Sequence, residues 1–188
     1  MKRQEELTIM EDQRKVVLFI AMSLDGYIAT EEDALEWLFK VEGEGDNGYT
    51  EFYETIDTVL MGRRTYEWIL EHMGRGAEFP YQGKECYVFS TTAHTPDSSV
   101  VFVQEDISSF IKKLENQPGK NIWLAGGGEL IRSFLKEKLI DEMRITVAPV
   151  VIGKGISLFK PDDYHLELSL KQTKQYNQFV ELYYEVKK

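Results

Sequence analysis

Three consecutive glycines, Gly126, Gly127 and Gly128, separate an apolar strand pattern from an amphipathic helix pattern in residues 121–135. Glycine has no side chain to keep a ligand away from the backbone. The helix that follows directs its unpaired N–H groups and its positive dipole end to the same place. This combination predicts a phosphate-binding turn. The alternative is a tight turn without a ligand, because the GxGxxG spacing of dinucleotide-binding folds is not present.

A second turn of the same kind follows residues 58–61, an apolar segment that reaches Gly62 and then a helical pattern over residues 63–70. Arg63 and Arg64 stand at the start of this helix, where the macrodipole favours acidic side chains. The chain carries a net charge of −10, so no general affinity for nucleic acid is expected. The two arginines therefore indicate a local anion site. The alternative is a solvated pair at a helix end.

Two further residues are of types that could act on a substrate. Asp25 lies in the turn SLDG, residues 23–26, and could orient a proton donor or a water molecule. The alternative for Asp25 is a turn aspartate that accepts hydrogen bonds from its own backbone. Trp37 could stack on a planar substrate, or it could be a core residue of a short helix.

Length and composition favour one domain. A chain of 188 residues with 43% hydrophobic content can bury one large core, and we expect a charged tail over residues 1–14 followed by a single domain over residues 15–188. Cys86 is the only cysteine, so no intrachain disulfide can form, and its apolar surroundings predict a buried structural thiol. His72, His94 and His165 lack the spacing of metal ligands, so no metal site is predicted. The chain contains no signal-peptide or membrane-spanning pattern, and a cytoplasmic protein with no membrane partner is expected.

Strand and helix patterns alternate through the first 148 residues. The predicted helices cover residues 34–41, 49–56, 63–70 and 107–116 and the segment after the glycines, and an acidic, glycine-rich loop at 42–48 could be mobile. The predicted strands cover residues 16–22, 58–61, 85–90, 99–103, 122–125 and 142–148, with a hairpin formed by 164–174 and 178–186 that turns near Asn177.

This order of elements predicts an α/β fold with a mainly parallel central sheet of about eight strands, helices on both faces and an antiparallel C-terminal hairpin. In such sheets, ligands bind beyond the carboxyl ends of the strands. The segments SLDG (23–26), MGRRT (61–65), FSTT (89–92) and AGGGE (125–129) would all lie at that edge. The sequence therefore predicts one pocket to which several motifs contribute.

Five motifs in order carry a family resemblance: IAMSLDGYIA at 20–29, MGRRTY at 61–66, VFSTT at 88–92, LAGGGEL at 124–130 and APVVIGKGISLF at 148–159. Together they resemble the dihydrofolate-reductase-like superfamily, and more narrowly the riboflavin-biosynthesis reductase (RibD C-terminal domain) family and its stand-alone bacterial members. The resemblance covers about residues 15–187. It implies a dihydrofolate-reductase-like fold and NADPH as the cofactor, bound along the sheet edge.

The resemblance also implies a role for each motif. One segment would bind the pyrophosphate and the adenosine 2′-phosphate, and a turn with hydroxyl side chains would contact the 2′-phosphate as well. A second glycine turn would bind phosphate, and two apolar positions would line the nicotinamide. In that order the residues are Gly62, Arg63, Arg64 and Thr65; Ser90, Thr91 and Thr92; Gly126, Gly127, Gly128, Glu129 and Leu130; and Ala21 and Ile28.

The chain departs from both families at the substrate. Dihydrofolate reductases present a carboxylate to the pteridine from a helix, but Gly48 stands at or near that position here, and Asp46 or Glu51 would have to substitute. Riboflavin-pathway reductases usually have an acid before the paired glycines, where this chain has Ala125. Phe52, used with Met61 to align this region, is predicted with Trp37 to contact the substrate.

These observations predict an NADPH-dependent reductase that transfers a hydride to a small heterocyclic or imine-like substrate. By resemblance, the leading activity is that of a 5-amino-6-(5-phosphoribosylamino)uracil reductase. The alternatives are a dihydrofolate reductase-like enzyme and an NADPH-binding scaffold without catalysis. The alternating apolar residues of the C-terminal hairpin predict either a packed sheet face or a homodimer interface.

Overall fold

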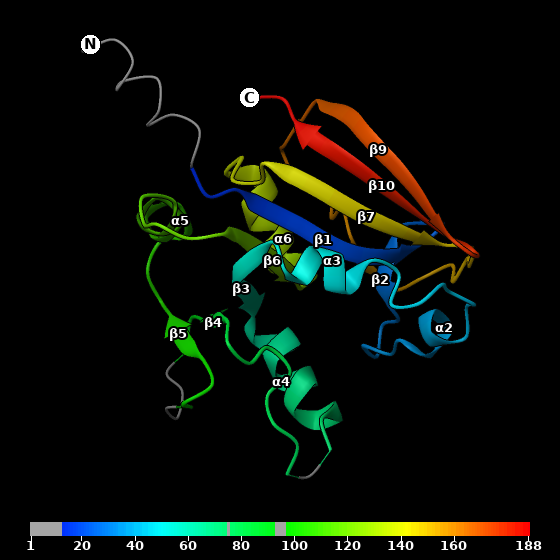
Figure 1. The fold of residues 1–188 in the computed structure, drawn as a ribbon, viewed down its shortest axis with the longest axis horizontal. Coiled ribbons are helices and arrows are strands. Elements are labelled where there is room, and N and C mark those ends of the chain that lie inside the picture. Colours follow the sequence, from blue (N-terminus) through cyan, green and yellow to red (C-terminus); the bar gives the residue numbers. More distant parts are fainter. Residues whose placement is uncertain (1–12, 75, 93–96) are drawn as a thin grey trace.

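The computed structural model describes residues 13–74, 76–92 and 97–188. Its central feature is a sheet of eight strands in the order β5-β4-β3-β6-β1-β7-β10-β9 (Figure 1). The strands are β1 (Val16–Ser23), β3 (Ile56–Gly62), β4 (Glu85–Phe89), β5 (Val101–Val103), β6 (Asn121–Gly126), β7 (Glu142–Ala148), β9 (Leu168–Tyr176) and β10 (Phe179–Val186).

In the order of the sheet, neighbouring strands pair in parallel from β5 through β4, β3, β6 and β1 to β7. Strand β10 runs antiparallel to both β7 and β9. The mainly parallel sheet with an antiparallel C-terminal hairpin is therefore confirmed. Central strands β1 and β3 are apolar along most of their length because helices cover both faces of the sheet there. The hairpin turns at Asn177, whose φ of 54° is a left-handed conformation that asparagine tolerates better than most residues.

Helices form a layer on each face of the sheet. Helices α5 (Ile107–Glu115) and α6 (Gly128–Lys136) pack on one face, where Phe110 and Phe134 join the inward side chains of β1 and β6. Helices α3 (Tyr49–Tyr53) and α4 (Arg63–His72) pack on the other face. The carboxylate of Asp106 accepts a hydrogen bond from Ser109 N at 2.9 Å, so Asp106 caps the N-terminus of α5. No helix within the described ranges is long and apolar enough to cross a membrane.

Several predicted boundaries differ from the structure. The predicted helix at 34–41 shrinks to α2 (Glu36–Phe39), and the predicted helix at 49–56 ends at Tyr53 because Ile56 already begins β3. The first strand of the hairpin begins at Leu168 rather than at 164 and continues to Tyr176. A small antiparallel pair, β2 (Tyr27–Ala29) with β8 (Ile156–Ser157), was not expected. Strands of two and three residues leave no periodic pattern in a sequence, so only the tertiary pairing reveals them.

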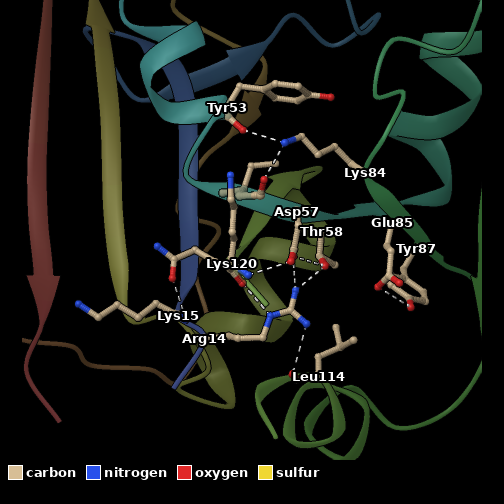
Figure 2. A network of polar contacts seen from close by, with 12 residues as sticks. Arg14, Lys15, Tyr53, Asp57, Thr58, Lys84, Glu85, Tyr87, Leu114 and Lys120 are labelled. Atoms are coloured by element: carbon tan, nitrogen blue, oxygen red, sulfur yellow. Dashed lines mark hydrogen bonds and ion pairs between the residues drawn. The ribbon is translucent and has the colours of Figure 1, made fainter. Parts of the chain in front are cut away.

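The predicted charged tail, residues 1–14, lies outside the described residues except for its last two. Arg14 is 4% exposed, and its guanidinium forms an ion pair with Asp57. It also donates to Thr58 Oγ1 at 2.5 Å and to the carbonyl oxygen of Lys120 at 2.7 Å (Figure 2). Arg14 is therefore part of the folded domain, because it supplies a buried charge that these groups hold in place.

Cys86, on β4, is 4% exposed. Desolvation raises the pKa of its thiol to about 11. A thiol that stays protonated at neutral pH is a poor nucleophile, which agrees with the predicted structural role.

Candidate active site

The two predicted phosphate-binding turns are adjacent. They end neighbouring strands β3 and β6, whose register places Met61 opposite Gly126. A Cβ atom built on Gly62 would lie 3.7 Å from the backbone nitrogen of Gly127, and one built on Gly127 would lie only 3.1 Å from Thr65 Oγ1. Any side chain at Gly127 would therefore occupy the space between the turns.

Each turn leads directly into a helix whose first N–H groups have no side-chain cap. Gly62 precedes α4 and Gly127 precedes α6, and neither residue can supply a capping oxygen. Unpaired N–H groups together with the positive ends of two helix dipoles form a site suited to an anion. The first turn of α4 contains no acidic residue and begins with Arg63 and Arg64, which adds positive charge.

The two arginines point to different neighbours. The Nη1 atom of Arg63 donates to Thr92 Oγ1 at 3.3 Å, beside the hydroxyl of Ser90, so Arg63 faces the hydroxyl-bearing turn after β4. Arg64 instead reaches the loop before α2, where its Nε and Nη2 atoms lie 2.8 Å and 2.5 Å from Asp33 Oδ2. Arg63 and the two hydroxyl groups thus place a positive charge and hydrogen-bond donors of the kind suited to an anion next to the glycine turns.

A cavity of about 850 Å³ joins these elements. Its size is within the range of small-molecule and cofactor sites. All fourteen residues predicted to bind the cofactor line it: Ala21, Ile28, Gly62, Arg63, Arg64, Thr65, Ser90, Thr91, Thr92, Gly126, Gly127, Gly128, Glu129 and Leu130. Tertiary folding brings together segments from β1, β2, β3, β4 and β6.

Six aromatic residues that sequence reasoning missed also line the cavity: Phe19, Tyr49, Trp68, Tyr81, Phe89 and Trp123. Four of them, Phe19, Tyr49, Tyr81 and Trp123, are called here the aromatic wall. Trp123 is at its centre, with ring centroids 6.2 Å from Phe19, 5.9 Å from Tyr49 and 5.3 Å from Tyr81, all edge-to-face. A hydrogen bond of 2.9 Å from Trp123 Nε1 to the carbonyl oxygen of Phe19 fixes its ring. The alternation of side chains along a strand was the available signal, because it places Trp123 on the same face of β6 as Ala125, next to the glycines.

The two predicted substrate-binding residues, Trp37 and Phe52, do not line the cavity. Phe52 is 1% exposed and stacks on Phe19, with ring centroids 4.0 Å apart, so it belongs to the core behind the aromatic wall. The residue of α3 that faces the cavity is Tyr49, three positions earlier. In the short helix α2, Leu38 and the preceding Leu35 face the cavity, whereas Trp37 lies on another side.

Asp25, the predicted catalytic residue, lies outside the cavity lining. Its carboxylate accepts hydrogen bonds from Ser23 Oγ at 2.6 Å, from Gly153 N at 2.7 Å and from Ile152 N at 3.2 Å. These bonds tie the turn after β1 to the segment between β7 and β8. These contacts give the oxygen atoms of Asp25 a structural role, and its catalytic role stays a prediction.

These bonds predict a pH-dependent contribution of Asp25 to stability. The hydroxyl of Ser23, followed by the backbone N–H groups, lowers the pKa of Asp25. A lowered pKa stabilises the fold above the ordinary carboxyl pKa of about 4, and this stabilisation is lost as pH falls through the folded-state value. We expect Asp25→Asn to lower the melting temperature at pH 7 and to differ less from the wild type as the pH falls below about 4. Thermal denaturation followed by circular dichroism measures both. A variant that melts like the wild type but loses turnover would support the catalytic role instead.

The acidic residues considered for a folate substrate do not reach the cavity. Gly48 precedes α3 with φ of 78°, and a Cβ atom there would lie 2.3 Å from the hydroxyl of Tyr176, so a carboxylate cannot stand at this position. Asp46 accepts hydrogen bonds from the backbone of Thr50 and Gly48, and Glu51 pairs with Lys174. Within the described ranges, no group of three or more acidic, histidine or cysteine side chains is placed to hold a metal ion.

Comparison with known proteins agrees with this geometry. The RibD C-terminal domain matches residues 14–182. The Bacillus subtilis protein YwjB is 49% identical over 173 residues, which are 92% of this chain and 98% of YwjB. A putative riboflavin biosynthesis protein from Shewanella sp. PV-4 has a TM-score of 0.82 and 32% identity, with coverage of 93% of this chain and 99% of that chain.

Two more distant structures share the fold. A deaminase/5-amino-6-(5-phosphoribosylamino)uracil reductase from Thermotoga maritima has a TM-score of 0.68 at 16% identity, and the match covers 97% of this chain and 59% of that longer chain. Dihydrofolate reductase from Enterococcus faecalis, complexed with NADP(H), has a TM-score of 0.64 at 14% identity, with coverage of 94% and 98%. The fold is dihydrofolate-reductase-like, and the chain belongs to the RibD C-terminal domain family.

Proposed function

We propose that this protein is an NADPH-dependent reductase that delivers a hydride to a small heterocyclic or imine-like substrate, in the manner of the 5-amino-6-(5-phosphoribosylamino)uracil reductases. One observation carries the proposal. Two helix N-termini without side-chain caps meet at adjacent glycine turns, and Arg63 with the hydroxyls of Ser90 and Thr92 stands beside them. A dinucleotide with an additional 2′-phosphate presents anionic groups that match both parts.

The residues present fit NADPH. The turns at Gly62 and Gly127 leave open space that a single Cβ atom would narrow, and their N–H groups would hold the pyrophosphate. Arg63, Ser90 and Thr92 would hold the 2′-phosphate through charge-assisted hydrogen bonds. Ala21 and Ile28, both in the cavity lining, would pack against the nicotinamide. When bound, NADPH supplies a hydride to an electrophilic carbon, and with a proton from solvent on the neighbouring heteroatom the products are NADP⁺ and the reduced substrate.

The lining of the cavity also bears on the two alternative functions, a dihydrofolate reductase-like enzyme and a scaffold without catalysis. A dihydrofolate reductase-like activity is disfavoured, because Gly48 cannot be replaced by an acid and neither Asp46 nor Glu51 lines the cavity. A scaffold without catalysis would bind NADPH and oxidise none. A panel of uncharged and phosphorylated heterocycles, assayed by the loss of NADPH absorbance, separates a reductase from a scaffold.

The 2′-phosphate assignment predicts that Arg63→Ala weakens NADPH binding by about 1 to 3 kcal/mol, because a charge-assisted hydrogen bond is lost. Binding of NADH, which has no 2′-phosphate, should change little. Fluorescence titration with NADPH and with NADH measures the two dissociation constants. Arg64→Ala is the comparison variant. It should weaken NADPH binding less, because Arg64 turns away from Thr92 to an ion pair with Asp33 at 2.5 Å, whereas Arg63 contacts Thr92 and its pair with Glu67 is longer, at 3.5 Å. Equal weakening of NADPH and NADH by Arg63→Ala would refute the assignment.

We also propose that the protein forms a homodimer through its C-terminal hairpin. Leu168, Leu170 and Val180 are exposed on β9 and β10, at the edge of the sheet where another chain could cover them.

A further inference from the structure

Two hydroxyl groups in the aromatic wall are free to bind a ligand. Tyr49 and Tyr81 line the cavity, and no hydrogen bond joins either phenolic oxygen to another of the described residues. Some other tyrosine hydroxyls are bonded, for example that of Tyr164 to the carbonyl oxygen of Lys160 at 2.7 Å. An unpaired phenol that faces a cavity is a hydrogen-bond donor with no competing partner in the fold.

Both phenols stay protonated at neutral pH. Desolvation raises the pKa of Tyr49 to about 12 and raises the pKa of Tyr81 further. The aromatic wall therefore consists of four uncharged rings, two of which present O–H groups.

The cations of the cavity lining lie outside the aromatic wall. Among the described residues, each cation that lines the cavity has an acidic partner: Arg63 with Glu67 at 3.5 Å, Arg64 with Asp33 at 2.5 Å, and Lys160 with Glu129 at 2.5 Å. None of these cations belongs to the aromatic wall. A buried charge without a counter-charge is costly, so an ionised ligand group would be disfavoured against this wall.

We propose that the aromatic wall binds an uncharged planar ring, which packs against Trp123 and accepts a hydrogen bond from the hydroxyl of Tyr49. Tyr49 is better placed than Tyr81 because it also contacts Phe19, at 6.3 Å between ring centroids. Phe19 is two residues before Ala21 on β1, on the same face of the strand, and Ala21 is the residue assigned to the nicotinamide. The inference rests on the proposed function and concerns the part of the substrate that contacts the aromatic wall, which would be a planar ring without an ionised group.

Two probes of equal shape test the charge preference. Quinazolin-4-one-2-carboxamide and quinazolin-4-one-2-carboxylate share one planar bicyclic ring and differ in a single charge. Titration calorimetry on the full chain should show the carboxamide binding at least tenfold more tightly. The same titrations on Arg63→Ala identify any carboxylate bound at the phosphate site, because that binding would be lost. Tighter binding of the carboxylate in Arg63→Ala, or no binding of the carboxamide, would overturn the proposal.

Tyrosine variants test the hydrogen bond. Tyr49→Phe keeps the ring and removes the donor, and it should weaken carboxamide binding about fivefold, the scale of one neutral hydrogen bond. Tyr53→Phe is the matched control, because Tyr53 is on the same helix and stacks on Tyr49 at 5.4 Å, but its hydroxyl is buried and it does not line the cavity. An equal effect of both substitutions, or none from Tyr49→Phe, would contradict the role of Tyr49.

NADPH affinity, measured on the same samples without probe, keeps the two proposals distinguishable. If the protein does not bind NADPH but binds the carboxamide as expected, the proposed reductase function is refuted and the proposed ring-binding site is supported. If the protein binds NADPH as expected but shows no preference for the carboxamide, the proposed ring-binding site is refuted and the proposed reductase function is supported.

Discussion

Gly127→Val is expected to abolish NADPH binding, with the dissociation constant raised about 100-fold or more, equivalent to roughly 2.8 kcal/mol. A Cβ atom at this position would lie 3.1 Å from Thr65 Oγ1, and the two methyl groups of valine would fill the space between the glycine turns. The φ of Gly127, −86°, is one that residues other than glycine adopt, so valine requires no left-handed backbone conformation. NADPH fluorescence titration measures the loss, and circular dichroism establishes that the sheet is retained.

Gly74→Val is the matched control for this prediction. Gly74 is exposed, and a Cβ atom there would meet nothing within 4 Å. The control should bind NADPH like the wild type. A folded Gly127→Val protein with normal affinity would show that the turns do not hold the cofactor, and the reductase proposal would lose its main support.

Asp57→Ala is expected to lower the free energy of unfolding by about 2 to 3 kcal/mol. The substitution leaves the guanidinium of Arg14, whose side chain is 2% exposed, without its acidic partner (Figure 2). It also removes the acceptor of a 2.8 Å hydrogen bond from Lys120 N. The expected loss of stability is smaller than for a fully buried ion pair. The side chain of Asp57 is 38% exposed, so water can replace part of its interaction with Arg14. Urea denaturation measures the change.

Glu185→Ala provides the comparison. Glu185 pairs with Lys171 at 3.1 Å, and both side chains are nearly half exposed, so its removal should cost at most about 0.5 kcal/mol. If Asp57→Ala were equally mild, the Arg14 network would not anchor the start of the domain to β3. Asp57→Asn keeps a hydrogen-bond acceptor but no charge, so its loss of unfolding free energy should lie between those of Asp57→Ala and Glu185→Ala.

Local patterns were sufficient for most of the fold. The strands around Val17, Val59 and Trp123 are apolar on both faces, which is how parallel strands covered by helices are recognised, and their alternation with helices predicted the sheet. Boundaries were less well predicted where an element is short. Helix α2 has four residues and strand β8 has two, and elements of this length depend on contacts that no local pattern records.

The same distinction holds for the candidate site. The positions of the glycine turns and Arg63 were predictable because a strand, a glycine and a helix that follow one another in the chain give this turn geometry locally, and such a turn is suited to a phosphate. The structural contacts of Asp25 could not be foreseen, because its partner, Gly153 N, is 128 residues away in the sequence. Phe52 was misassigned because the side of α3 that faces the cavity is set by how that helix packs on β1 and β6.

By itself, the sequence determined where this protein could bind a dinucleotide, since each binding turn consists of consecutive residues whose conformation follows from their own types. Only the tertiary structure decided what the rest of the cavity can accept. Tyr49, Tyr81 and Trp123 come from three separate segments, and their rings meet because α3 and the loop after α4 pack on the same face of β6. Contacts between distant segments depend on the packing of the whole core, and such packing has no signature within any one segment.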